Sequence, residues 1–303
     1  MQRHTERVSD RGRNWLEWHD TILVPQFKFD HGGQLRDSRV RLVGIDVDGT
    51  LVGTGGFIHP GIWDAAVRAG KRGIHLALCS GRPAFGVALE YARRLEAGGW
   101  HIFQNGASVI HLATGKSRSV PIPIEWKDKL IHQARSTGED LELYSDTTYV
   151  AESASAWARE HADLLGVAFE PRPLESLTQP IVRAQWLLSR ERAREFTCAP
   201  HPGLEVVQAG SPLMPDTQFV GLTREGVTKG NAIRSVAEGY GIPLQDVMYV
   251  GDAGNDLSAL RIVGHPIAMG NAEPAVLEAA GHVVGHVNQG GLAQALEMAL
   301  NQR

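Results

Sequence analysis

The sequence has few cysteines and no long apolar run. Its 303 residues include only Cys79 and Cys198, which lie too far apart to support a disulfide framework or a thiolate zinc site. No apolar stretch reaches the roughly 18 residues that a membrane-spanning helix needs. The charged residues 1–7 are followed by no apolar signal-peptide core. We therefore expect a soluble, cytoplasmic protein without a membrane partner.

The sequence also has no excess of positive charge. Lys and Arg number 30 against 34 Asp and Glu, and the net charge is −4. The basic residues are scattered along the chain, which does not favour binding to nucleic acid or to anionic lipid. We predict no nucleic-acid partner, and a small anionic substrate would need a local positive site. The sequence does not indicate an oligomeric state.

Strand and helix patterns alternate at both ends of the sequence. This alternation is typical of an α/β fold, here a Rossmann-like, doubly wound parallel sheet with right-handed crossovers. Apolar runs and helix start and stop signals place the individual elements. The predicted strands are 40–47, 74–79, 101–104, 247–250, 266–269 and a weaker 282–287, with helices at 60–72, from Pro83 onward, and near the C-terminus.

The chain is long enough for two domains. Predicted elements become shorter between residues 107 and 214, where prolines are frequent. We therefore predict an α/β domain at 107–214, inserted into a first domain formed by 38–106 and 215–303, with an N-terminal extension at 1–37. The predicted elements of the inserted domain are strands at 141–143, 148–151 and 183–188 and helices at 124–137, 154–165 and 190–197.

Two acidic segments each follow a predicted buried strand directly. If these strands are neighbours in a parallel sheet, their carboxyl ends bring four aspartates together. Carboxylates about 5 Å apart repel by roughly 3 kcal/mol per pair at an effective dielectric of about 20, so the cluster requires a cation or shared protons. A divalent, oxygen-binding ion fits best, and we predict Mg²⁺. The predicted ligands are Asp46, Asp48, Asp252 and Asp256.

The first acidic segment predicts phosphoryl chemistry. Asp46 is ionised at neutral pH and could attack phosphorus without a base, forming an acyl phosphate. Asp48, on the same side of the strand, could serve as acid and base. Gly49 and Thr50 would form a tight turn whose amides bind phosphate oxygens. The alternative is that Asp-Gly only marks a turn.

Two further segments predict contacts to phosphate. Ser80, Gly81 and Arg82 follow the second strand and precede the helix expected to open at Pro83, an arrangement that suits an anion. The alternative is that Ser80 only caps the helix. Lys229 opposes a helix dipole at the start of its helix, which favours a role in neutralising phosphate and holding Asp46, although such a lysine can also simply face solvent.

Other patterns near the second acidic segment are less specific. Asn255 could link the surroundings of the ion to phosphate. A calcium loop is the competing interpretation of residues 251–256, but its ligand spacing and distal Glu are missing. His282 and His286 would lie about 13 Å apart on a strand, too far to share a metal. Residues 53–56 could open and close the site or form a plain turn.

Four segments, taken in order, resemble the four motifs of the haloacid dehalogenase superfamily. They are residues 46–51, 79–83, 229–230 and 251–256. The insertion between the second and third motifs resembles the α/β cap of the Cof-type, subclass IIB sugar-phosphate phosphatases. The pair Asn105 and Gly106 also matches the Asn-Gly that leads that family into its cap. The resemblance covers about residues 40 to 298.

The resemblance implies a Mg²⁺-dependent phosphatase of small phosphorylated metabolites, with sugar phosphates as the expected class. Asp46 would be phosphorylated, Asp48 would act as acid and base while its carbonyl binds the metal, and Asp252 and Asp256 would anchor the metal.

The resemblance also implies that Ser80 and Lys229 grip the phosphoryl group and that Arg82 touches the substrate at the edge of the site. Two alternatives stay open. A hexose-phosphate mutase would share Asp46 and Asp48 but return the phosphoryl group to another hydroxyl, and a catalytically idle protein would only bind phosphorylated metabolites.

Overall fold

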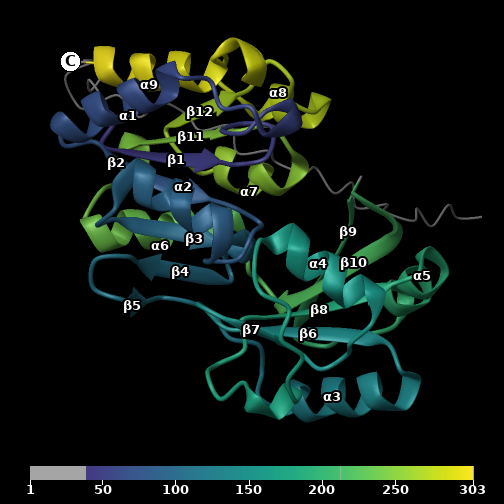
Figure 1. Ribbon diagram of the computed structural model, residues 1–303. Coiled ribbons are helices and arrows are strands. Elements are labelled where there is room, and N and C mark those ends of the chain that lie inside the picture. The colour runs from purple at the N-terminus through teal and green to yellow at the C-terminus, as the bar shows by residue number, and fades with distance from the viewer. Residues whose placement is uncertain (1–38, 212, 303) are drawn as a thin grey trace, which may run out of the picture. The chain divides into compact units, whose positions relative to one another are not determined.

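The computed structural model describes residues 39–211 and 213–302. Within these residues the strands form two sheets, one of eight strands and one of five (Figure 1). The predicted extension at 1–37 lies outside the described residues. None of the helices described combines the length and the apolarity required to cross a membrane.

The eight-stranded sheet brings the two acidic segments together. Its central strand β1 (Leu42–Asp46) pairs in parallel with β2 (His75–Cys79) on one side and with β11 (Val247–Gly251) on the other. The side-by-side placement predicted for the two strands is therefore confirmed. The full order is β13-β12-β11-β1-β2-β3-β4-β5, with β3 at Trp100–Phe103, β4 at Ser108–His111, β5 at Lys116–Ser117, β12 at His265–Ala268 and β13 at His282–Val283.

Helices cover both faces of this sheet. Every residue of β1 is buried, and alternate side chains enter different clusters: Val43 and Ile45 pack in one, Leu42 in the other. At Gly44 an added Cβ would lie 2.7 Å from the Tyr249 ring, so the strand packs closely there. The first cluster includes α1 (Gly61–Lys71), α2 (Gly86–Glu96) and α9 (Gly291–Asn301), and the second includes α6 (Lys229–Tyr240), α7 (Leu257–Leu260) and α8 (Pro274–Ala279).

The inserted α/β cap has its own antiparallel sheet and its own core. Trp186 and Leu143 lie in an apolar cluster between the sheet and two of its helices, α3 and α5, while α4 contacts the other face through His161 and Glu142. The strand order is β7-β6-β8-β10-β9. The elements are β6 (Asp140–Tyr144), β7 (Tyr149–Ala151), β8 (Arg183–Leu188), β9 (Leu204–Ser211), β10 (Met214–Arg224), α3 (Glu125–Thr137), α4 (Ala156–Leu165) and α5 (Arg190–Cys198).

Several elements differ from the predicted ones. β4 and β5 extend the eight-stranded sheet beyond residue 106, and β10 continues the cap sheet beyond 214. Each sheet therefore includes residues on the far side of one predicted boundary, and the exact domain limits stay a prediction. Helix α2 begins at Gly86 rather than at Pro83, because residues 81–85 form a loop. β13 ends at Val283, so His286 does not lie on a strand.

Candidate active site

Three of the four predicted acidic residues meet at the carboxyl ends of β1 and β11. Asp46 is the last residue of β1, Asp252 directly follows β11, and Asp256 lies in the short turn beyond it. One carboxylate oxygen from each lies within 4.8 Å of the others. Asp48 is absent from this group within the described residues. Its side chain is 60% exposed and pairs with Arg82 instead.

Lys229 reaches this cluster from the first turn of α6. Its Nζ donates to Asp46 Oδ1 at 2.6 Å and to Asp256 Oδ1 at 2.7 Å, and its side chain is fully buried. A lysine buried in this way is not the solvent-facing residue of the alternative interpretation. The helix begins here because Thr228 caps it, accepting a hydrogen bond from the Asn231 amide at 3.1 Å.

Burial and the Lys229 ammonium act in opposite directions on the pKa of Asp46. Burial raises the pKa of the Asp46 carboxyl well above its usual range, the Lys229 ammonium opposes this rise, and Asp256 adds to it. Burial disfavours the charged ammonium as well, but the two carboxylates outweigh burial and raise the pKa of Lys229. Lys229 thus opposes the effect of burial on Asp46, but burial outweighs it and the pKa of Asp46 stays raised.

Asp256 is held by four hydrogen bonds. Its Oδ1 accepts from the Tyr249 hydroxyl at 2.7 Å as well as from Lys229. Its Oδ2 accepts from the amides of Asp252 and Ala253 at 3.0 and 3.1 Å. These contacts fix the carboxylate at the bottom of the site, where it is fully buried.

Asp252 is more accessible and is oriented by side chains from other loops. The Thr50 hydroxyl donates to its Oδ1 at 3.1 Å, and the Asn271 side chain donates to its Oδ2 at 3.3 Å. Burial raises the pKa of Asp252 to about 6, Thr50 opposes this rise, and Asp256 adds to it. Gly49 passes so close that an added Cβ would lie 2.0 Å from Asp252 Oδ2, so only glycine fits here.

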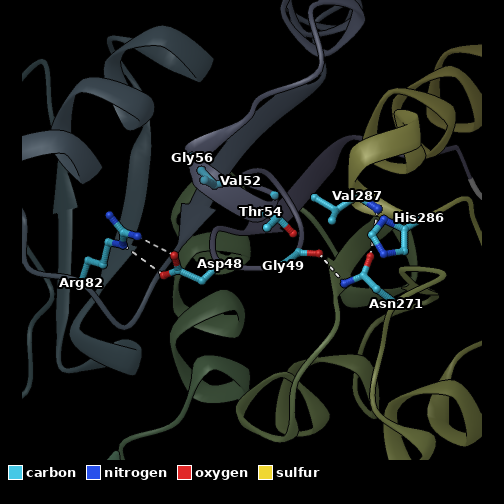
Figure 2. A pocket seen from close by; sticks show the side chains of 10 residues that line it. Asp48, Gly49, Val52, Thr54, Gly56, Arg82, Asn271, His286 and Val287 are labelled. Carbon is cyan, nitrogen blue, oxygen red and sulfur yellow. Dashed lines mark hydrogen bonds and ion pairs between the residues drawn. The ribbon is translucent and has the colours of Figure 1, made fainter. Parts of the chain in front are cut away.

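Asn271 joins three loops at this edge of the sheet. Besides Asp252, its Nδ2 donates to the Gly49 carbonyl at 2.8 Å, and its Oδ1 accepts from the Val287 amide at 2.9 Å (Figure 2). The sequence analysis did not single it out. Its position directly after β12 (His265–Ala268) in Met269-Gly270-Asn271 was the available signal, since loops after parallel strands share one edge.

A cleft of about 420 Å³ opens beside the cluster. Arg82 Nε donates to Asp48 Oδ2 at 3.0 Å, and Figure 2 shows the guanidinium directed at the carboxylate. Asp48, the residue predicted to act as both acid and base, therefore lies at the wall of this cleft. The lining residues are Asp48, Gly49, Val52, Gly53, Thr54, Gly56, Arg82, Asn271, His286 and Val287.

Two predicted phosphate contacts are corrected. The amides of Gly49 and Thr50 are not free, because they donate to the carbonyls of Val52 at 2.9 Å and Val47 at 3.3 Å as the turn closes on itself. The Thr50 hydroxyl is fully buried and binds Asp252 instead. The helix predicted to open at Pro83 begins at Gly86, so its first amides do not directly follow Ser80 and Gly81 as the sequence analysis assumed.

The remaining predicted residues lie in the loops around the cluster. Ser80 is fully buried and its Oγ accepts from the Arg82 amide at 3.0 Å, so it shapes the loop rather than capping α2. Gly81 contributes its carbonyl to a contact with the cap described below. Asn255 is exposed and donates to the side chain of Asn105 at 3.0 Å.

The cluster suits a divalent metal ion. Lys229 supplies one positive charge to the carboxylates of Asp46, Asp252 and Asp256, which leaves two negative charges when all three are ionised. Oxygen ligands gathered within 4.8 Å, with this charge, match the preference of Mg²⁺. The residues present therefore fit the predicted ion.

Comparison with known proteins identifies the family. The model of the haloacid dehalogenase-like hydrolases matches residues 43–296. The chain belongs to this family. The hydrolase is 27% identical to YxeH of Bacillus subtilis over 265 residues, which cover 84% of this chain and 97% of YxeH. It is 23% identical to the 5-amino-6-(5-phospho-D-ribitylamino)uracil phosphatase YwtE of Bacillus subtilis, covering 86% of this chain and 99% of YwtE.

Solved structures agree with this fold. A haloacid dehalogenase-like hydrolase from Bacteroides thetaiotaomicron superposes with a TM-score of 0.76 at 25% identity, covering 86% of this hydrolase and 99% of that chain. The subclass IIB sugar phosphatase BT4131 gives 0.69 at 24% identity, covering 86% and 98%. The predicted family, the fold class and the enzyme class, a phosphatase, are confirmed.

Proposed function

We propose that the hydrolase cleaves phosphomonoesters of small metabolites in a Mg²⁺-dependent reaction that passes through an aspartyl phosphate on Asp46. The observation that supports this most is the hydrogen bond from Lys229 to Asp46, which orients the carboxylate inside a buried acidic cluster and opposes the rise that burial causes in its pKa. An ionised and oriented carboxylate is a competent nucleophile toward phosphorus.

In the first half-reaction Asp46 attacks phosphorus and the ester P–O bond breaks. Asp48 gives a proton to the departing alcohol oxygen, so the alcohol leaves neutral. Its exposed position at the wall of the cleft supports this role, because the leaving group must reach it. Arg82, bonded to Asp48, would meet the substrate at the same wall.

In the second half-reaction water attacks the phosphorus of the aspartyl phosphate. Asp48, now ionised, accepts a proton from that water, the acyl P–O bond breaks, and phosphate and free Asp46 are released. Lys229 stays beside Asp46 through both steps and offsets the negative charge that gathers on the transferring group.

We propose that Asp46, Asp252 and Asp256 hold the Mg²⁺ ion, with the Asp48 carbonyl as a further ligand. When bound, the ion would neutralise charge on the phosphoryl oxygens. Tyr249 and two backbone amides orient Asp256, while Thr50 and Asn271 orient Asp252. Such outer contacts commonly tune metal affinity.

Sugar phosphates are the substrate class that we propose first, by analogy with the sugar phosphatase BT4131, whose fold this chain shares. A panel of phosphorylated sugars, nucleotides and cofactors, assayed with Mg²⁺ and with EDTA, tests the proposal. We expect phosphate release that matches substrate loss and disappears with EDTA. Transfer of the phosphoryl group to another hydroxyl, without free phosphate, would instead identify a mutase.

A further inference from the structure

Arg183 lies on the cap at the point where the cap contacts a loop of the active site. It is the first residue of β8 (Arg183–Leu188), and its guanidinium donates to the Gly81 carbonyl at 3.2 Å. Gly81 stands between Ser80 and Arg82, and Arg82 lines the catalytic cleft. Arg183 is thus one residue away, through the loop backbone, from a group that touches Asp48.

The charge of Arg183 has no acidic partner within the described residues. Its guanidinium lies over the Tyr144 ring, 4.2 Å from the centroid, and its Nε is buried without a hydrogen-bond acceptor. Burying part of a cation and leaving one of its donors unpaired costs free energy, unless an anionic group forms an ion pair with it. The contacts to Tyr144 and Gly81 alone leave this requirement unmet.

The carboxylate diagonally across the strand pair is already engaged. Glu142 pairs with Gln185 in the sheet register, two positions from the Tyr144 and Arg183 pair. It accepts hydrogen bonds from the Tyr144 hydroxyl, from Gln185 at 3.1 Å and from His161 at 2.8 Å. With its oxygens used by three donors and fully buried, Glu142 does not form an ion pair with Arg183.

Aromatic rings close one side of this corner. Phe85, from the loop before α2, stacks on Tyr149 with centroids 5.7 Å apart and lies parallel to Tyr144 at 6.3 Å. These rings lower the local dielectric around Arg183, which strengthens any ion pair formed there. The guanidinium geometry suits a planar carboxylate or a phosphate group.

We propose that Arg183 binds a second anionic group of the substrate, so that the preferred esters carry a carboxylate or a second phosphate besides the phosphate that is cleaved. This inference rests on the proposed phosphatase function and adds to it a residue that selects the substrate. Charged recognition from the cap would discriminate such substrates from neutral sugar phosphates of the same size.

The test compares substrates that differ only in the second group. The first pair is 3-phosphoglycerate and glycerol 3-phosphate, which share a skeleton and differ by a carboxylate in place of a hydroxymethyl group. The second pair is fructose 1,6-bisphosphate and fructose 1-phosphate. We expect the unaltered protein to favour the member that carries the second anionic group in at least one pair, by about tenfold or more in kcat/KM, and the favoured pair identifies the source of the anion.

Variants of Arg183 then assign the preference. Arg183→Met should reduce the ratio of kcat/KM within the favoured pair by about 10- to 100-fold, and Arg183→Lys should restore part of it. Arg172→Met is the matched control, because Arg172 is an exposed cap arginine that also donates to a backbone carbonyl, that of Tyr149. Its ratio should equal that of the unaltered protein.

Two results would overturn the role of Arg183. One is a ratio near one in both pairs for the unaltered protein, and the other is a ratio that Arg183→Met leaves unchanged while both rates fall together. Calorimetric binding of the same four esters to the Asp46→Asn protein measures the preference without turnover. Absence of phosphate release from every ester would therefore refute the phosphatase proposal, while the binding ratios would still decide the role of Arg183.

Discussion

At the scale of single residues, one ammonium group organises the acidic cluster. Lys229 bonds both Asp46 and Asp256, so the nucleophile proposed here is fixed by the same group that offsets its charge. The sequence supports this role through the position of Lys229, where it gives nothing to helix stability. The orientation of the attacking oxygen therefore depends on a residue 183 positions away in the chain.

The Asp46→Asn substitution should reduce phosphate release from p-nitrophenyl phosphate by about 1,000-fold or more, because an amide cannot form the aspartyl phosphate. The fold should persist, since Asn has the same size and can still accept from Lys229. Phosphate release and circular dichroism measure the two effects. Asp64→Asn, at an exposed position of α1, is the control, and near-normal turnover by Asp46→Asn would exclude the nucleophile assignment.

His101 should make folding stability depend on pH. Its Nδ1 accepts from the Leu78 amide at 3.0 Å, so its Nε2 donates to the Glu96 carbonyl at 2.8 Å and the ring is neutral. Burial lowers the pKa of His101 to about 4. The unfolded chain binds a proton below about pH 6.5 while the folded protein does not, so stability falls as pH drops from about 6.5 to 4, by up to about 3 kcal/mol.

Urea unfolding across this pH range measures the effect of His101. His101→Gln, which can keep a donor near the Glu96 carbonyl but cannot titrate, should be less stable at pH 7.5 and should lose less stability on acidification. Other groups titrate in both proteins. The contribution of His101 is therefore the difference between the two proteins in how steeply stability changes with pH. Parallel slopes would show that His101 does not contribute the pH dependence.

At the scale of elements, the site is an edge of a sheet rather than a segment of sequence. Loops after β1, β11 and β12 supply Gly49, Asp252 and Asn271, and a hydrogen-bond network joins them. The third loop contributes a neutral side chain rather than a carboxylate to this network, and motif analysis overlooked it. The orientation of Asp252 depends on this neutral side chain, since Asn271 reaches both Gly49 and Asp252.

The Asn271→Ala substitution should weaken Mg²⁺ binding by about 10- to 100-fold, because it removes contacts that orient Asp252. Titration calorimetry of the purified protein with Mg²⁺ measures this directly. Asn288→Ala is the matched control, since Asn288 also bridges loops, accepting from the Thr54 amide at 3.3 Å, without touching an aspartate. Equal Mg²⁺ affinity in the two variants would count against a positioning role for Asn271.

The sequence predicts some elements well and others poorly, for physical reasons. β1, β11 and β8 have continuous apolar or alternating patterns that local propensity determines, and they were placed closely. The start of α2 was placed too early, because Pro83 is compatible with both a helix and a loop. β4 and β5 pair with the strands directly before them in the sequence, but they are only four and two residues long and so leave little local pattern. The limits of β10 depend on its pairing with β8 and β9.

The same distinction applies to the site. Asp46, Asp252, Asp256 and Lys229 were predicted to meet, and the structure brings them together. The roles proposed for them stay predictions. Asn271 and Arg183 were not singled out from the sequence, because their importance depends on contacts between segments far apart in the chain.

At the scale of the whole molecule, core and cap have separate apolar clusters. The proposed Mg²⁺ ligands all belong to the core, so bound metal should stabilise the core and leave the cap sheet unaffected. At a free Mg²⁺ concentration 100 times Kd, the expected stabilisation is about 2.7 kcal/mol. In hydrogen-exchange mass spectrometry, amides of β1 and β11 should gain protection on addition of Mg²⁺, whereas those of β6 and β8 should not.

The Asp252→Asn variant, which lacks one proposed metal ligand, is the control for this prediction. The substitution removes one carboxylate from the cluster, so the metal-free protein should be at least as stable as the unaltered one, while the protection conferred by Mg²⁺ should largely disappear. Equal gains in protection over both sheets, or a gain that survives in Asp252→Asn, would contradict a metal site confined to the core.

The placement of β11 beside β1 also has a consequence for synthesis on the ribosome. β1 and β2 emerge early, but β11 follows roughly 200 residues later, which takes about 10 to 40 s at typical translation rates. During that interval one edge of an apolar strand has no neighbour to pair with. The nascent polypeptide therefore needs shielding, by chaperones or by transient contacts, until translation delivers the missing strand and the enzyme can mature.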